Sequence, residues 1–171
     1  SVDKETVTVQ PGMIYRELQG VLHSHKRFLP PYPASIDFAS IGGAVANNSA
    51  GEKTVKYGST RNYVEGLRVV LANGDVIETR RLSAKELKAK QAQPDFEGHL
   101  YRNVDYLIEE HWDTIRAAFP KVSKNSAGYD LWHVKGTDGS FDLGQLIIGS
   151  QGTLGVVTEM RLRHEPWNPH T

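Results

Sequence analysis

The chain has 171 residues, and its 20 basic side chains balance its 20 acidic ones, so the formal net charge at pH 7 is zero. This balance provides no overall electric field to attract nucleic acid or an anionic membrane, so we expect neither partner. The lack of cysteine excludes disulfides, thiolate metal sites and cysteine-ligated iron–sulfur clusters. No apolar run approaches the ~20 residues that span a bilayer, and we expect one domain in the cytoplasm.

The first half of the chain predicts a strand, a helix and a hairpin. Residues 6–9 are all β-branched and predict a strand, and a helix to about His25 follows from the spacing of Ile14, Leu18, Val21 and Leu22. Residues 64–71 and 76–79 are strand-like and flank Asn73-Gly74. This dipeptide predicts a hairpin with a type I′ turn, which needs a positive φ at both central residues.

The second half predicts helices and a closing strand. Ser83 and Glu86 have the spacing of a capping box that begins a helix. Residues 98–119 place apolar side chains on one face over five turns and predict one continuous helix. Val156, Met160 and Leu162 belong to a last strand, which Pro166 and Pro169 end as a linker would. These elements predict an α+β fold, with a mainly antiparallel (mixed) sheet and helices packed against it.

Two glycine-rich segments stand out. The first, residues 30–51, has a proline-rich entry, a Ser40 that can cap a helical turn, and the adjacent Gly42 and Gly43. Free N–H groups at a helix start, with the positive end of the helix dipole behind them, predict a loop that holds a phosphate or pyrophosphate. The second, residues 149–159, has three glycines at intervals of three before an alternating strand. Either segment alone could be an ordinary turn.

Four passages together resemble a known family. They are residues 40–51, which begin Ser-Ile-Gly-Gly, residues 56–67, residues 124–131 and residues 149–159. In their order and spacing the chain is similar to the FAD-binding domain of the FAD-linked oxidases and dehydrogenases typified by vanillyl-alcohol oxidase and p-cresol methylhydroxylase. It is most similar to the branch of glycolate oxidase, D-lactate dehydrogenase and D-2-hydroxyglutarate dehydrogenase.

The resemblance implies a particular domain organisation. Residues 1–166 would form the second, larger subdomain of a two-part FAD-binding domain, and residues 167–171 a linker toward a substrate-binding cap that the chain does not include. Without the cap the catalytic residues stay unknown, because the family's cap supplies the base and a site for the substrate carboxylate. The sequence therefore looks like a fragment of a longer protein, and we expect this piece alone to be inactive.

The resemblance also implies the residues that bind FAD. Ser40, Ile41, Gly42 and Gly43 would line the pyrophosphate, Asn48 and Gly51 would approach the isoalloxazine, and Pro31 and Pro33 would shape the wall beside the ring. Gly152, Gly155, Val156 and Val157 would lie near the ribose and adenine. Gln151 departs from the family, which often has Glu there, so that contact is in doubt.

Other polar residues leave alternatives open or suggest no site. Arg61 could lie near the anionic ligand or form a surface ion pair. Tyr129 reads as a packed aromatic residue without a chemical role. His23 and His25 point to different faces of a helix, and the remaining histidines show no metal-ligand spacing, so no metal is expected.

The predicted function is that of an FAD-dependent dehydrogenase or oxidase. The longer protein would oxidise a small 2-hydroxy acid by hydride transfer to the flavin, which is what the resemblance implies. Two alternatives stay open, namely oxidation of an aromatic or sugar alcohol on the same flavin loops and a catalytically silent nucleotide-binding module.

Overall fold

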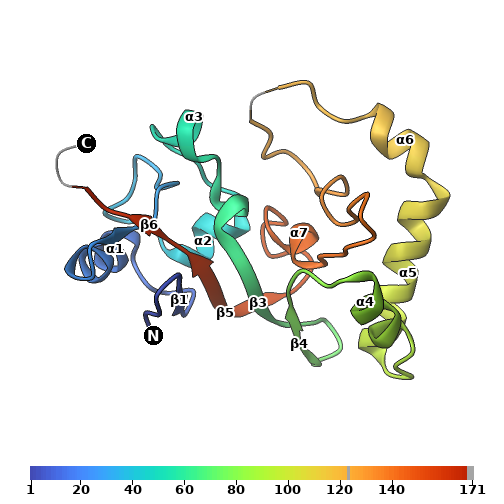
Figure 1. The fold of residues 1–171 in the computed structure, drawn as a ribbon. Coiled ribbons are helices and arrows are strands. Elements are labelled where there is room, and N and C mark those ends of the chain that lie inside the picture. The colour runs from blue at the N-terminus through green and yellow to red at the C-terminus, as the bar shows by residue number, and fades with distance from the viewer. Residues whose placement is uncertain (123, 169–171) are drawn as a thin grey trace.

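The computed structural model describes residues 1–122 and 124–168 (Figure 1). In chain order the elements are β1 (Thr6–Val9), α1 (Tyr15–Ser24), β2 (Arg27–Phe28), α2 (Ile41–Ala46), α3 (Thr54–Tyr57), the 3₁₀ helix η1 (Thr60–Tyr63), β3 (Val64–Val70), β4 (Val76–Thr79), α4 (Ala84–Gln91), α5 (Phe96–Glu110), α6 (Trp112–Ala117), α7 (Gly144–Ile147), β5 (Val156–Arg163) and β6 (Glu165–Pro166).

The central sheet has the strand order β1-β5-β3-β4, and each neighbouring pair is antiparallel. β5, near the end of the chain, lies between β1 and β3. Helices α1 and α4–α6 lie at opposite ends of the molecule, with the sheet, α2 and α7 between them (Figure 1). The structure therefore confirms the predicted α+β class with an antiparallel sheet.

The hairpin between β3 and β4 lies where Asn73-Gly74 predicts it, but the predicted turn type is wrong. The Gly74 N–H donates to Leu71 O, and the Leu71 N–H donates to Asp75 O, both at 2.9 Å. Gly74 has a φ of 88°, whereas Asn73 does not have a positive φ. The loop is a type I turn followed by a left-handed glycine, which needs only one residue with φ above zero.

The single helix predicted over residues 98–119 is two helices. α5 ends at Glu110, and His111, with φ −111° and ψ 18°, separates it from α6. The apolar stripe is divided between them: Ile108 and Ile115 are buried, whereas Leu107 and Phe119 are 44% and 49% exposed. The stripe therefore predicted the helical conformation of residues 98–110 and 112–117, but the helix ends before Phe119 and the core covers less of the stripe than expected.

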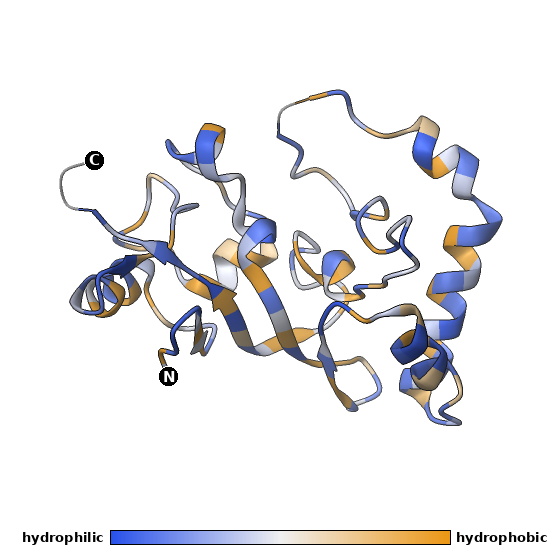
Figure 2. Ribbon diagram, viewed as in Figure 1, coloured by the Kyte–Doolittle hydropathy of each residue, from blue (hydrophilic) through white to orange (hydrophobic). Residues whose placement is uncertain are grey.

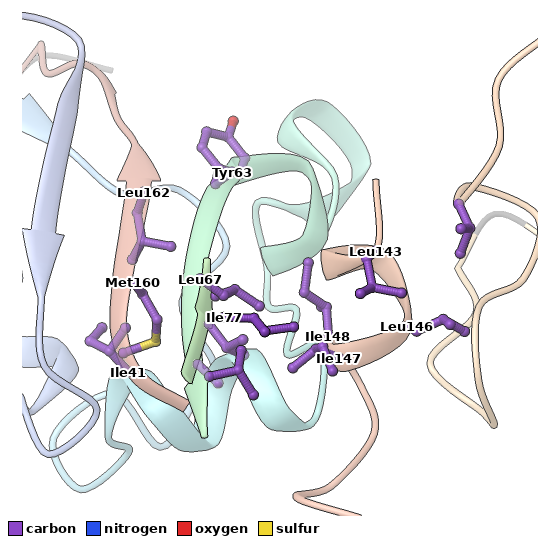
Figure 3. Packing of buried hydrophobic residues seen from close by; sticks show 14 of the residues in the cluster. Ile41, Tyr63, Leu67, Ile77, Leu143, Leu146, Ile147, Ile148, Met160 and Leu162 are labelled. Carbon is purple, nitrogen blue, oxygen red and sulfur yellow. The ribbon is translucent and has the colours of Figure 1, made fainter. Parts of the chain in front are cut away.

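The core fastens α2 and α7 to the sheet. Figure 3 shows Met160 of β5 beside Ile41 at the start of α2, and Ile147 and Ile148 at the end of α7 facing β3. Hydrophobic residues recur along β3, while α4 is largely hydrophilic (Figure 2). Asn48 follows the end of α2 and Gly149 follows the end of α7, so this packing sets the positions of both glycine-rich segments.

The C-terminal part of the described chain returns to α1. β6 pairs antiparallel with β2, the Trp167 N–H donates to Lys26 O at 3.0 Å, and the Trp167 ring stacks on His23 with centroids 4.1 Å apart. Of the predicted linker, residues 169–171 lie outside the described residues, Pro169 among them.

Candidate cofactor site

The first glycine-rich segment forms the capped helix that its sequence predicts. Ser40 is the N-cap of α2, and its Oγ accepts a hydrogen bond from the Gly43 N–H at 3.1 Å. The expectation of free N–H groups is wrong, because the Ile41 N–H donates to Met13 O at 2.8 Å and the Gly42 N–H to Pro11 O at 2.9 Å. The first three amides of α2 therefore already have protein acceptors and do not form an open anion site.

Close packing explains two glycines of this segment. A Cβ at Gly42 would lie 2.5 Å from the Pro11 Cβ, and a Cβ at Gly51 would lie 1.8 Å from Tyr32 O. Neither position can accept a side chain without moving the backbone. Gly51 thereby lets the segment with buried Pro31 and half-buried Pro33 lie directly against the chain that follows Asn48.

The two glycine-rich segments meet at the C-terminal end of α2. The Gly149 N–H donates to Val45 O at 3.0 Å, and the Gln151 N–H donates to Ala46 O at 2.9 Å. The second loop therefore satisfies carbonyl groups that the end of a short helix leaves without intrahelical donors. The structure brings the second loop to the end of α2, not to its capped start at Ser40.

Asn48 is fixed between the segments. It is 1% exposed and has a left-handed φ of 45°, a conformation that Asn tolerates better than most residues. Its Oδ1 accepts from the Arg61 N–H at 3.0 Å, and its Nδ2 lies 3.4 Å from Asn125 O. The amide predicted to approach the flavin is thus already oriented by protein contacts.

Arg61 is a buried structural contact and not a surface ion pair. Its Nη1 donates to the carbonyl and the side-chain oxygen of Gln145 at 2.7 and 3.0 Å, and its Nη2 donates to Ile148 O at 2.9 Å. Its Nε lies 3.2 Å from an Asp130 carboxylate oxygen, with side chains only 10% and 12% exposed. Of the two predicted readings, the surface ion pair is wrong.

Asp130 also holds His133. Its two carboxylate oxygens lie 2.9 and 2.7 Å from the His133 Nδ1, and one accepts from the His133 N–H at 3.0 Å. Burial alone would raise the pKa of Asp130, but the hydrogen bonds from His133 and the charge of Arg61 outweigh it and lower that pKa. Asp130 is therefore a carboxylate at neutral pH, shared by a buried guanidinium and a partly exposed imidazole.

The second loop is open to solvent. Gly152 and Val156 are exposed, Gly155 and Val157 are half-buried, and Gly152 adopts a φ of 78° with no atom within 4 Å of the place that a Cβ would occupy. Among the described residues, the amides of Gly152 and Leu154 have no protein acceptor. These two N–H groups, rather than those of α2, are available to a ligand.

Gly155 has a packing role. A Cβ there would lie 2.7 Å from Val69 Cγ1 and 2.9 Å from Val70 O, so a side chain would collide with β3. A substitution at this glycine would therefore disturb the sheet whether or not a ligand is present.

A cleft of about 570 Å³ lies beside this site. Its lining includes Asn48, Asn125, Asp130, His133 and Lys135. Lys135 is neutralised by Asp105 and Glu109, at 2.6 and 2.5 Å. Of the residues predicted to bind the cofactor, Asn48 alone lines this cleft in the part of the chain that the structure describes.

Sequence reasoning did not identify Asp130 or His133 as part of the site. Arg61 and Asp130 each lie inside a passage that resembles the family, so an ion pair joining the two passages was the available signal. Asp130 and His133 are three residues apart, a spacing at which one turn brings a carboxylate to both a backbone N–H and a ring nitrogen.

The described residues contain neither a membrane-spanning helix nor a metal-binding cluster. Within residues 1–122 and 124–168, no helix is long and apolar enough to cross a membrane. The same residues contain no group of three or more His, Asp or Glu side chains that could hold a metal ion.

The chain is similar to a family model and to several known proteins. Residues 1–80 match a family model described as an FAD binding domain. The chain is 32% identical over 167 residues to D-2-hydroxyglutarate dehydrogenase of Pantoea ananatis, covering 97% of this chain and 16% of that protein. It is 34% identical over 167 residues to glycolate oxidase subunit GlcD of Bacillus subtilis, covering 96% and 25%.

A third relative is the mitochondrial D-lactate dehydrogenase [cytochrome] of Arabidopsis thaliana, which is 32% identical over 170 residues, covering 99% of this chain and 21% of that protein. The chain thus spans between 16% and 25% of the length of these relatives.

Solved structures show the same fold. Alkyldihydroxyacetonephosphate synthase, in two crystal forms, superposes with TM-scores of 0.55 and 0.56 at 21% and 23% identity, covering 94% and 97% of this chain and 21% and 20% of those chains. These likenesses show the fold, and the match of residues 1–80 to an FAD binding domain agrees with the resemblance found in the sequence.

Proposed function

We propose that this chain supplies the larger part of the FAD-binding domain of a flavin-dependent dehydrogenase that oxidises a 2-hydroxy acid. The observation that carries the proposal is the alignment of 97% of the chain with D-2-hydroxyglutarate dehydrogenase at 32% identity. The substrates named for the three relatives, D-2-hydroxyglutarate, glycolate and D-lactate, share a carboxylate beside a carbon that bears a hydroxyl. That shared group is the substrate class we propose.

When bound, FAD supplies the acceptor for the hydride that leaves this carbon. The part of this chain is to bind and orient the cofactor. We assign the exposed amides of Gly152 and Leu154 as donors to its polar groups, and Gly155, Val156 and Val157 as the strand surface beside the ribose and adenine. The support is the open loop conformation and the 65% exposure of Val156.

We propose that the first glycine-rich segment binds FAD more by surface contact than by hydrogen bonds. We assign Asn48, Gly51, Pro31 and Pro33 to the isoalloxazine end, since Gly51 packs the proline-rich chain against the residues after Asn48. Ser40, Ile41, Gly42 and Gly43 would border the pyrophosphate through backbone surface, because the amides of residues 41–43 are already paired within the protein.

The proposal extends to the rest of the protein. A cap outside residues 1–166 would hold the small-molecule substrate, with residues 167–171 leading toward it, and the enzyme would act in the cytoplasm. Cell fractionation with an antibody against residues 1–166 tests the location, and limited proteolysis near residue 167 tests the boundary.

The deciding experiment is an absorbance spectrum of the longest polypeptide that contains this sequence. We expect a visible flavin band that bleaches without oxygen on addition of D-2-hydroxyglutarate, D-lactate or glycolate. Glutarate, propionate and acetate, which lack the 2-hydroxyl, are the matched controls and should leave the band unchanged. Bleaching by an aromatic or sugar alcohol alone would contradict the substrate class, and a protein without flavin would contradict the cofactor.

A further inference from the structure

We infer that Arg61 is a positioning residue of the cofactor site: its buried guanidinium fixes the second glycine loop against α2 and Asn48, and FAD affinity depends on that placement. The inference rests on the proposed function, because it concerns the same cofactor. It goes beyond that function because it makes FAD affinity depend on Arg61. The Arg61 side chain holds the second loop through the backbone of the residues that precede it, such as Ile148.

One residue joins four parts of the chain. The side chain of Arg61 binds Gln145 and Ile148 at the two ends of α7 and Asp130 in the preceding loop, while its main-chain N–H holds Asn48. A guanidinium offers five N–H donors in a fixed plane, so the directions of the contacts to Gln145, Ile148 and Asp130 are set at once. Arg61 therefore fixes α7, the loop with Asp130 and Asn48 relative to one another.

The contact to Ile148 lies where the second loop leaves the core. The Ile148 carbonyl directly precedes Gly149, where a Cβ would lie 3.5 Å from Arg61 Nη2. The next residues adopt left-handed conformations, with φ 83° at Gly149, 55° at Gln151 and 78° at Gly152. Non-glycine residues such as Gln151 hold such a conformation only when their surroundings impose it. Arg61 is part of those surroundings.

Lysine cannot take the place of Arg61. Its ammonium is a single point on a flexible stem and cannot bind Gln145, Ile148 and Asp130 in one plane. Arg61→Lys keeps the positive charge for Asp130 yet loses the simultaneous contacts. This variant therefore separates charge from geometry.

The test uses the longest polypeptide that contains this sequence. Arg61→Lys, Arg61→Ala and the matched control Arg16→Ala are prepared without FAD, and the dissociation constant for FAD is measured by flavin fluorescence. Arg16 pairs with Asp37 at 2.6 Å on the surface, with side chains 60% and 57% exposed. We expect the dissociation constant to rise at least tenfold in both Arg61 variants and less than twofold in Arg16→Ala. Methylguanidinium should restore affinity to Arg61→Ala and leave the wild type unchanged.

The outcomes separate the inference from the proposed function. Wild-type affinity in Arg61→Lys, or equal losses in the Arg61 and Arg16 variants, would overturn the role of Arg61. Melting temperatures without FAD identify a variant that fails to fold, and if Arg61→Ala fails, Arg61→Lys decides. Reduced stability with unchanged affinity in the folded variants would show a merely structural role and overturn the inference. No FAD binding by the wild type would instead overturn the proposed function.

Discussion

A glycine in the site and a glycine outside it are subject to different physical constraints. Gly51 lies where a backbone oxygen occupies the space of a Cβ, whereas Gly20, in α1, has no atom within 4 Å of that position. The first glycine is required by its neighbours, and the second only weakens its helix. These two positions allow a controlled comparison.

We expect Gly51→Ala to lower the free energy of unfolding by about 3 kcal/mol, because the new methyl would collide with Tyr32 O. Gly20→Ala should raise it by about 0.5–1 kcal/mol, since alanine favours the helix. Urea unfolding measures both. A loss in Gly51→Ala no larger than about 0.5 kcal/mol would contradict the packing argument.

The buried carboxylate of Asp130 predicts a pH dependence. Its pKa in the folded protein is lowered, so the carboxylate stabilises the fold above its unfolded pKa of about 3.9 and loses that effect as the pH falls through the folded pKa. Asp130→Asn removes the carboxylate that pairs with the buried Arg61 and should cost about 3 kcal/mol at pH 7.

The difference in unfolding free energy between the wild type and Asp130→Asn should shrink as the pH is lowered below about 4. Urea unfolding at a series of pH values from neutral downward measures it. The same difference at every pH would be inconsistent with an ionised, stabilising Asp130. Asp37→Asn serves as the control, because Asp37 forms an exposed ion pair with Arg16.

Among the secondary-structure elements, the hairpin between β3 and β4 has a turn that can be tested directly. Ala72 is exposed at the second position of the type I turn, where proline is favoured, and its N–H has no acceptor among the described residues. Gly74 has a φ of 88°. The two positions therefore respond oppositely to stiffer residues.

Ala72→Pro should raise the free energy of unfolding by about 0.5 kcal/mol, because it restricts the unfolded chain. Gly74→Ala should lower it by about 1 kcal/mol, because a left-handed conformation is unfavourable for alanine. Thermal and urea unfolding test both. Destabilisation by Ala72→Pro would contradict the type I turn and favour the two-residue type I′ turn.

The spacing of residues in the sequence predicted those helices and strands that depend on residues close together in the chain. The β-branched residues 6–9, the apolar positions of α1 and the capping box of Ser83 and Glu86 form the strand and helices expected from them. The break at His111 has no such signal, because neither Gly nor Pro interrupts the stripe. A distant contact lies one turn further on: the Trp132 indole donates to Ile115 O at 2.6 Å and ties α6 to a later segment.

In the site, too, contacts between residues close in the sequence were predicted and contacts between distant residues were not. Ser40 as a cap was visible in the sequence, because a cap involves residues three apart. The loss of free amides was not, since their acceptors, Pro11 and Met13, lie about 30 residues earlier and only the fold brings them there. Arg61 was noted as a candidate, but its partners lie up to 87 residues away.

For the whole molecule, the function we propose divides the cofactor site between this chain and residues outside it. We expect residues 1–171 alone to fold and to bind FAD weakly or not at all. Each lost contact to a phosphate costs about 1.5–3 kcal/mol, and each ~1.4 kcal/mol is tenfold in affinity.

Isothermal calorimetry with FAD on residues 1–171 and on the longest polypeptide measures the difference, and circular dichroism confirms that the shorter chain is folded. Submicromolar binding by residues 1–171 would contradict this expectation and place the whole site within this chain.

The position of β5 has a consequence for synthesis. Within the described part of the chain, β5 is the only strand of the central sheet that pairs with β1, yet it comes about 150 residues later. At about 5–20 residues per second, the ribosome needs roughly 7 to 30 s to make the intervening chain. During that time the nascent β1 and the inner edge of β3 stay unpaired and open to chaperones or to other chains. The sheet closes as a late event, only after residues 156–163 have left the exit tunnel.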